Sequence, residues 1–185
     1  MSIGAVVLAA GSSRRLGRPK QLVRLGEETL VERAVRVCLE AGCEPVMVVL
    51  GASADLVRKT CSFQSAVIVN NERWEEGMGS SLRVGVSALG TDRDGVVVMT
   101  CDMPAVSPEH LRKLTRTGET TASSYSGRRG VPAYFPREMF GQLLELHGDA
   151  GARELLKDAR VVELVDGELD VDTLEDLARA RELYG

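Results

Sequence analysis

The sequence predicts an α/β fold of three layers, in which helices cover both faces of a mostly parallel sheet. Four valine-rich runs with almost no polar interruption are typical of strands buried on both faces: residues 5–10, 46–50, 66–69 and 96–100. Helical patterns lie between these runs, as expected for crossover helices that join parallel strands. A chain of 185 residues has the size of one domain, so we expect a single domain over residues 1–185.

Capping signals place several of the helices. TLVE, which begins at Thr29, is a capping box and predicts a helix that ends at Ala41, before Gly42. Ser107 followed by Pro108 predicts a helix to about residue 116. TLED at residues 173–176 is typical of the start of a last helix. Further helices are expected at 53–61, 80–89 (with serine caps), 138–146 and 152–158, and further strands at 121–124, 131–135 and 161–165, with a flexible stretch at 126–130.

Composition excludes several classes of function. The net charge of −4 and the pI of about 5.3 give no sign of a nucleic-acid or membrane surface, so neither partner is expected. No apolar run approaches the roughly 20 residues needed to span a bilayer, and the start lacks a signal-peptide pattern, so a cytoplasmic location is expected. The four cysteines form no CxxC pair and are expected to be buried apolar residues. Of the two histidines, His110 is expected to be exposed in the first turn of its helix.

A basic loop follows the first apolar run. Small residues at 9–13 allow a ligand to approach the backbone, whose consecutive N–H groups can cradle phosphate oxygens. Arg14, Arg15, Arg18 and Lys20 then add positive charge suited to phosphate. In α/β sheets ligands bind beyond the carboxyl ends of the strands, so this loop outlines a nucleoside triphosphate site. It has neither a Walker A nor a GxGxxG motif, and taken alone it is equally compatible with a solvated loop.

Acidic residues form a second group of candidates. Asp102 follows the run at 96–100 within CDMP, where a carboxylate can hold Mg²⁺; the alternative is an Asx-turn residue. Asp149, Asp170 and Asp172 are candidates for a second metal ligand. Alternation along an extended segment places Asp170 and Asp172 on one face, whereas the alternative is that Asp172 or Thr173 caps the last helix.

These motifs together resemble the MobA-like nucleotidyltransferase family. VLAAGSSRRLGRPK (residues 7–20) is similar to the family signature LAAGxSxRMGxxK, with Leu16 in place of methionine. Four later stretches match in order: NNERWEEGMGSSL (70–82), DMP (102–104), GDAGAR (148–153) and DVDTLEDL (170–177). The set most resembles the molybdenum cofactor cytidylyltransferase branch. LAAG instead of LAGG is similar to cytidylyl rather than guanylyl transferases, an indication that rests on Ala10.

The resemblance implies a Rossmann-like nucleotidyltransferase fold and a Mg²⁺-dependent transfer of CMP from CTP to the phosphate of molybdopterin, with release of pyrophosphate. Arg15, Lys20 and Asp102 would be catalytic, and Asp102 would hold the metal with Asp170 or Asp172. Nucleotide contacts are implied for Leu8, Ala9, Ala10, Gly11, Ser13, Arg15, Lys20, Asn70, Ser80, Ser81 and Asp102. Substrate contacts are implied for Arg129, Pro132, Asp149 and Arg153, although RRGVP at 128–132 is equally compatible with a solvated loop.

Other functions are compatible with the same residues. A GTP-dependent molybdenum cofactor guanylyltransferase and a sugar-phosphate nucleotidyltransferase share this chemistry. A carrier that binds the cofactor without transferring a nucleotide is a non-catalytic alternative. In each molybdenum case the partners are a nucleotide (CTP or GTP), a molybdopterin-type cofactor and, by transient contact, a molybdenum hydroxylase.

Overall fold

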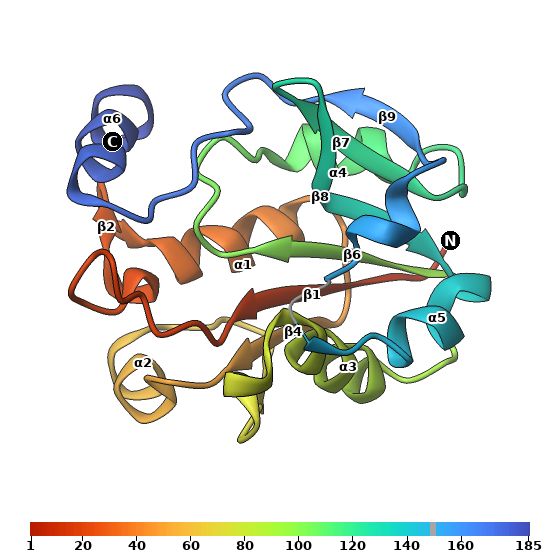
Figure 1. Cartoon of the computed structure of the whole chain (residues 1–185), viewed down its shortest axis with the longest axis horizontal. Helices are drawn as coiled ribbons and strands as arrows, with labels where there is room; N and C mark the ends of the chain where they lie inside the picture. The colour runs from red at the N-terminus through yellow and green to blue at the C-terminus, as the bar shows by residue number, and fades with distance from the viewer. Residues whose placement is uncertain (149–150) are drawn as a thin grey trace.

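A computed structural model describes residues 1–148 and 151–185, and its centre is a seven-stranded sheet of order β5-β4-β1-β6-β8-β7-β9 (Figure 1). The strands are β1 (Ile3–Ala9), β4 (Val46–Leu50), β5 (Val67–Asn70), β6 (Gly95–Thr100), β7 (Thr121–Tyr125), β8 (Arg128–Pro136) and β9 (Arg160–Glu163). The four valine-rich runs form β1, β4, β5 and β6, which are all parallel to one another. The predicted mostly parallel α/β sheet is therefore confirmed.

Of the seven strands of this sheet, β8 alone runs in the opposite direction. β8 runs antiparallel to both β6 and β7, while β9 is parallel to β7. The stretch at 126–130, expected to be a flexible connection, is instead the turn of the β7–β8 hairpin and the first residues of β8. Its residues form strand because Arg128 and Arg129 pair with Tyr125 and Ser124 across the hairpin.

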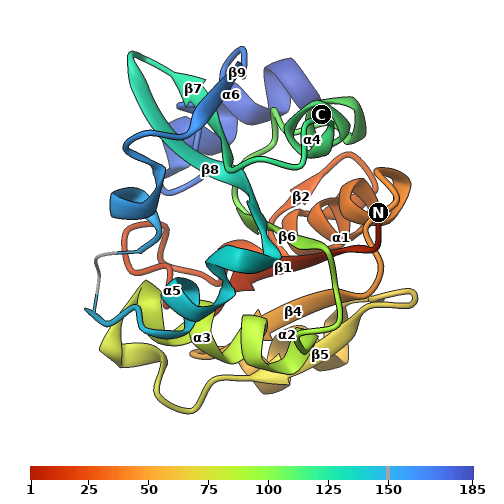
Figure 2. The same ribbon diagram turned by 90° about the vertical axis from the view of Figure 1, so that its right-hand side faces the viewer.

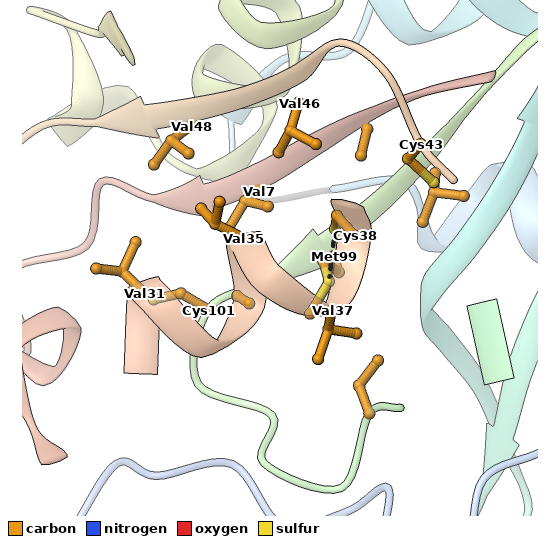
Figure 3. Close-up of a cluster of buried hydrophobic side chains, with 14 of the residues drawn as sticks. Val7, Val31, Val35, Val37, Cys38, Cys43, Val46, Val48, Met99 and Cys101 are labelled. Carbon is orange, nitrogen blue, oxygen red and sulfur yellow. Dashed lines mark hydrogen bonds between the residues drawn. The ribbon is translucent and has the colours of Figure 1, made fainter. Parts of the chain in front are cut away.

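Helices cover both faces of the sheet, as predicted. α1 (Leu30–Glu40) and α4 (Pro108–Thr115) pack on one face, and α3 (Met78–Leu89) and α5 (Phe140–Leu144) pack on the other (Figure 2). On the first face, Val31, Val35 and Cys38 of α1 lie against Val7 of β1 and Met99 of β6 (Figure 3). Burial raises the pKa of the Cys38 thiol well above its ordinary value, so this cysteine is an apolar core residue, as expected.

A third cluster joins the C-terminal segment to the region after β1. α6 (Leu174–Tyr184) packs beside the small hairpin of β2 (Arg24–Leu25) and β3 (Glu28–Thr29). Leu169 and Val171 precede this helix and share a buried cluster with Leu16 of the basic loop. The end of the chain is thereby held beside the predicted phosphate-binding loop.

The capping predictions are confirmed at three helices and wrong at one. Thr29 with Glu32 and Thr173 with Asp176 form complete capping boxes, and the Ser107 hydroxyl accepts a hydrogen bond from the His110 N–H at 3.2 Å. α3 has no serine cap: it begins at Met78, two residues before the predicted start, because the left-handed Gly77 (φ +102°) ends the preceding turn.

Shorter helical elements lie between these, among them 3₁₀ turns at Lys20–Leu22 and Trp74–Glu76. α2 covers Ala54–Thr60, the helix expected at 138–146 is reduced to a 3₁₀ turn followed by α5, and the one expected at 152–158 is a 3₁₀ turn at Arg153–Leu156. Cys61, at the end of α2, is only half-buried. Among the described residues, no helix is long and apolar enough to cross a membrane.

His110 is buried, contrary to the expectation of an exposed side chain. It is 6% exposed, and its Nε2 lies 2.7 Å from the hydroxyl of Ser123 on β7. That hydroxyl donates to the carbonyl of Pro132 at 2.6 Å, so it accepts from an Nε2–H of the imidazole. The side chain faces inward because α4 packs against β7 and β8 on this side.

We expect His110 to make the folded protein less stable at low pH. Burial first, and the charge of Lys113 second, lower the pKa of His110 to about 4. The folded state then binds fewer protons than the unfolded state, whose histidine titrates near ~6.5, so this contribution is complete above pH ~6.5 and is lost towards pH ~4. In urea unfolding at pH 7.5 and pH 5, the wild type should lose about 2 kcal/mol more than His110→Gln.

Glutamine retains an N–H donor for Ser123 and does not titrate, which makes His110→Gln the matched control for this measurement. Comparing the two proteins cancels the contribution of every other group. An equal loss of stability in both proteins would contradict this role for His110.

Candidate functional site

The site lies where β1 and β6 end side by side. Both strands point to the same edge of the sheet, with Leu8 paired to Thr100 (Figure 1). The loop after β1 and the turn that contains Asp102 therefore begin next to each other, and the Cys101 N–H donates to the Leu8 carbonyl at 3.2 Å. The parallel register of two buried strands thus brings the basic loop to the carboxylate, as predicted from the sequence.

Buried Gln21 fixes the start of the basic loop. Its Nε2 donates to the carbonyls of Ala9 at 2.7 Å and of Gly11 at 3.0 Å. The side chain is 1% exposed, so these bonds form away from water. We did not predict this residue. A glutamine after a basic run has no recognisable role in the sequence, because its partners are backbone carbonyls that only the folded loop brings near.

Ser13 holds the far end of the same loop. Its backbone is left-handed (φ +55°), and its carbonyl accepts bonds from the N–H groups of Leu16 and Gly17. Its hydroxyl accepts from the Lys20 N–H at 2.9 Å. Ser13, predicted to contact the nucleotide, thus fixes the backbone of Lys20, while Ser12 lines the cavity beside the loop.

Lys20, Asp102 and Asp172 form an ion-pair cluster at the centre of the site. The Lys20 ammonium donates to Asp102 Oδ2 and, at 2.9 Å, to Asp172 Oδ1. Arg15 Nη2 lies 2.5 Å from the other oxygen of Asp172, although the Arg15 side chain is 71% exposed. The Val171 N–H donates to the Asp102 carbonyl at 3.0 Å, which brings Asp172 to the cluster from the far end of the chain.

Burial makes the charges of this cluster strongly interdependent. Burial disfavours the Lys20 ammonium, but the charge and hydrogen bond of Asp102 outweigh that effect and raise the pKa of Lys20 above its ordinary value. Asp170 lies beside this cluster. Burial, with the neighbouring charges of Asp102 and Asp172, raises the pKa of Asp170. The cluster therefore holds more carboxylates than Lys20 can neutralise.

One oxygen of this cluster is left without a partner. Asp102 Oδ1 is buried and has no hydrogen-bond partner among the described residues. No three acidic, histidine or cysteine side chains of the described chain come close enough together to hold a metal on their own. A buried free carboxylate oxygen with a second acid beside it fits Mg²⁺, which commonly takes one or two protein carboxylates and completes its shell with phosphate and water.

Two hollows meet at the cluster. The first, of about 380 Å³, lies between the basic loop and the start of α3, and the second, of about 680 Å³, lies towards β7, β8 and the C-terminal segment. Lys20, Asp102, Thr100 and Met78 line both. The site can therefore hold two ligands, one on each side of the Lys20–Asp102 pair.

The first hollow is lined by small, charged and aromatic residues. Leu8, Ala9, Ala10 and Gly11, which the sequence predicts to contact a nucleotide, line it, and Arg14 rather than Arg15 adds positive charge. Trp74, Glu75, Gly77, Met78 and Ser81 also line it. Gly51 spaces the wall here: an added Cβ would lie 2.7 Å from the Trp74 Cβ and 2.8 Å from the carbonyl oxygen of Ala10.

Asn71, rather than Asn70, holds the part of the wall that contains Ser81. The buried Asn71 Nδ2 donates to the hydroxyls of Ser80 at 2.8 Å and of Ser81 at 2.9 Å. Asn70, predicted as a nucleotide contact, is exposed and lines a different shallow hollow. Ser80 is buried and absent from the lining, so of the two predicted serines only Ser81 reaches the cavity. The sequence shows two consecutive asparagines, Asn70 and Asn71, but it does not show which of them points towards the cavity.

The second hollow contains part of the predicted substrate site. Arg153, Asp170 and Asp172 line it, together with Gly130 and Val131 of the RRGVP stretch. Arg129 and Pro132 do not: the Arg129 Nε donates to the Ala159 carbonyl at 3.2 Å, and the Pro132 carbonyl is bonded to Ser123. Asp149 lies outside the described residues.

Two further side chains complete this part of the site. The Tyr125 hydroxyl, which sequence analysis missed, donates to the Val131 carbonyl at 3.0 Å and shapes the wall of the second hollow. Cys101 is 3% exposed, and burial, with the nearby charge of Asp102, raises the pKa of its thiol to about 12. Cys101 is therefore a packing residue, as expected, and not a nucleophile.

Comparison with known proteins shows the family of the chain. The model of the family described as MobA-like NTP transferase domain matches residues 5–164. The chain belongs to this family. The match ends before Asp170, Asp172 and α6, so the C-terminal acids lie beyond the family model.

Curated relatives carry several names. Nicotine blue oxidoreductase of Paenarthrobacter nicotinovorans is 36% identical, covering 96% of this chain and 95% of its own. Probable molybdenum cofactor guanylyltransferase of Opitutus terrae is 34% identical over 73% of this chain and 67% of its own. Molybdenum cofactor cytidylyltransferase of Escherichia coli is 24% identical over 99% and 97%. The relatives agree on the family but not on one substrate.

Solved structures share the whole fold. Rv0371c of Mycobacterium tuberculosis H37Rv superposes with a TM-score of 0.84 at 34% identity, covering 98% of both chains. The complex of Rv0371c with manganese gives a TM-score of 0.83 at 31% identity, covering 99% of this chain and 100% of the other. The α/β nucleotidyltransferase fold is thereby confirmed.

We expect Lys20 and Asp102 to stabilise the fold as a coupled pair. Lys20→Met leaves a buried carboxylate without its counter-charge, which should lower the free energy of unfolding by about 3–5 kcal/mol. Adding Asp102→Asn removes that stranded charge, so the double variant should be more stable than Lys20→Met alone. Urea unfolding of the four proteins of this double-mutant cycle gives the coupling energy, which we expect at roughly 1–3 kcal/mol. Additive effects of the two substitutions would contradict the pairing.

Proposed function

We propose that the protein is a Mg²⁺-dependent nucleotidyltransferase that transfers CMP from CTP to the phosphate of a molybdopterin-type cofactor and releases pyrophosphate. The observation that carries the proposal is the meeting of two hollows at Lys20 and Asp102. A transferase must bring a nucleotide and an acceptor to one phosphorus atom, and these hollows open on the same two charged side chains.

The first hollow suits the nucleotide. Its small residues at 9–11 allow close approach of phosphate oxygens to the backbone, and Arg14 and Lys20 supply positive charge. Trp74, which also lines this hollow, offers an apolar ring as a wall for the nucleobase. The α-phosphate would then lie near Lys20, at the boundary with the second hollow.

The second hollow suits an anionic acceptor. Arg153 and Arg15 line it, and both can pair with a phosphate group. A phosphate monoester is already largely ionised at neutral pH, so its oxygen can attack the α-phosphorus without a general base. The new O–P bond forms as the bond to the β-phosphate oxygen breaks, and pyrophosphate leaves with its electron pair.

The charged residues lower the barrier by positioning and by charge compensation. Two anions must approach each other, and Lys20 and Arg14 would compensate the charge that develops on pyrophosphate. Asp102 and Asp172, with Asp170 nearby, would hold the divalent ion, which when bound supplies further positive charge at the phosphates. The buried Asp102 Oδ1, which lacks a protein partner, supports this assignment.

The choice of CTP rests on Ala10 and on Glu75. Both residues line the first hollow, and Glu75 supplies it with a carboxylate. A carboxylate accepts a hydrogen bond from the exocyclic amino group of cytosine, and uracil has no such donor. Guanine also carries an amino group, so GTP is the second candidate, in line with the guanylyltransferase relative.

The first experiment measures pyrophosphate release with Mg²⁺ and a molybdopterin-type cofactor for CTP, GTP, ATP and UTP. We expect release with CTP above the other three nucleotides. Asp102→Asn should lower the rate by about 10²–10³ while the protein stays folded, because one charged contact of the transition state is lost. Asp158→Asn, at an exposed position away from both hollows, is the matched control.

Each alternative has its own outcome in this experiment. Release with GTP instead keeps the chemistry and overturns the assignment to CTP. Tight cofactor binding with no release from any nucleotide would indicate a carrier. Since one relative is named nicotine blue oxidoreductase, reduction of nicotine blue is measured in parallel, and reduction without pyrophosphate release would reject the transferase.

We expect Gly51→Ala to weaken nucleotide binding. The added methyl group would meet Ala10 and Trp74 at 2.8 Å or less, so one wall of the first hollow must shift. The KM for the nucleotide should rise roughly tenfold, in proportion to overpacking of about 1–3 kcal/mol. Gly141→Ala is the control, because its Cβ meets nothing within 4 Å. An unchanged KM in Gly51→Ala would exclude this wall from nucleotide binding.

A further inference from the structure

The Lys20 ammonium contacts both Asp102 and Asp172 and so occupies the place where a divalent cation could bind the two carboxylates. We propose that Lys20 is an exchangeable counter-ion: it pairs with Asp102 and Asp172 in the free protein, and it moves to the triphosphate when the nucleotide binds. The divalent cation would then bind tightly only together with the nucleotide. This inference rests on the proposed function, because it takes the ligand of the first hollow to be a nucleoside triphosphate.

The contacts of the two carboxylates support an exchange of cations. Lys20 engages Oδ2 of Asp102 and leaves Oδ1 buried without a partner. Asp172 gives one oxygen to Lys20 and the other to Arg15. The free oxygen shows that the pair has unused capacity for a cation, while Lys20 occupies the space between the two acids.

Lys20 is also built to move without unfolding the loop. Its backbone N–H is fixed by the Ser13 hydroxyl, so a change of position can be confined to its flexible four-carbon side chain. The side chain lines both hollows, which places its ammonium within reach of a triphosphate in the first. A lysine is a mobile point charge, unlike the fixed fork of an arginine.

Charge makes the two binding events favour each other. A divalent cation between Asp102 and Asp172 would repel the ammonium. The Lys20 side chain is 18% exposed in its pair with Asp102, so an ammonium displaced with no new partner would lose its counter-charges at a largely buried place. A triphosphate supplies that partner. By linkage, the nucleotide raises the affinity for the cation by the same factor as the cation raises the affinity for the nucleotide.

The test is Mn²⁺ binding without nucleotide, followed by the electron paramagnetic resonance signal of free Mn²⁺. Lys20→Met should bind Mn²⁺ roughly tenfold or more tightly than the wild type, since the competing charge is gone. Lys59→Met removes an exposed lysine of α2 and should match the wild type. Affinity in Lys20→Met no higher than in Lys59→Met would overturn the proposal, as would equally tight binding by the unmodified protein.

The melting temperature gives a second readout, which remains informative if Lys20→Met is less stable than the wild type. Saturating Mn²⁺ should raise the melting temperature of Lys20→Met and leave that of the wild type nearly unchanged, because the metal replaces the missing counter-charge. Lys20→Gln, which keeps a hydrogen-bond donor without charge, should respond to Mn²⁺ in the same way. No Mn²⁺-dependent rise in either variant would reject the exchange.

These measurements separate the inference from the proposed function. Pyrophosphate release by the wild type with no gain of Mn²⁺ affinity in Lys20→Met would reject the exchange and keep the transferase. A gain of Mn²⁺ affinity in a protein that releases no pyrophosphate would reject the transferase and keep the carboxylate pair as a cation site competed by Lys20.

Discussion

The parallel pairing of β1 with β6 is the constraint on which the site depends. Both strands are buried on both faces, and their register ends them at the same edge of the sheet. Hydrophobic burial therefore brings together two oppositely charged segments that are 82 residues apart at Lys20 and Asp102. The attraction between the charges is not needed to bring the two loops together, because the pairing of the strands already places them side by side.

Desolvation then determines how these charges behave. Lys20 and Asp102 are largely buried, so each requires the other, and removing either costs more than removing a surface pair. Asp170 and Asp172 add negative charge that Lys20 alone does not neutralise. A site of this kind suits ligands that bring both charges, such as a metal with phosphates. The polar groups around it, Gln21 and Asn71, are fully buried and fix the walls through hydrogen bonds.

Much of this could be predicted from the sequence, and the exceptions have a common cause. Long valine-rich runs and capping boxes are local signals, so the strands, α1 and α6 were placed correctly. The sequence also predicts site residues at Lys20, Asp102, Asp172 and 8–11, because charge or small size at a strand end is a local signal, and the structure places these residues around the two hollows. His110, Gln21 and the roles of Asn70 and Asn71 were missed or misassigned, because each depends on which distant backbone the side chain meets. The 3₁₀ turn at Arg153–Leu156 was predicted to be a longer helix, because an apolar pattern alone does not fix the length of an element.

The bond between the Val171 N–H and the Asp102 carbonyl has a consequence for the synthesis of the chain. Domains emerge from the ribosome with the N-terminal end first. Lys20 and Asp102 both leave the ribosome before residues 169–172, so their pair can form first, and Asp172 joins it later. The apolar side chains of Leu169 and Val171 arrive with Asp172 and cover Leu16 beside the basic loop. Residues 169–172 thus bring the second carboxylate to a pair that can already exist, so a nascent chain can hold Lys20 against Asp102 before it has Asp172.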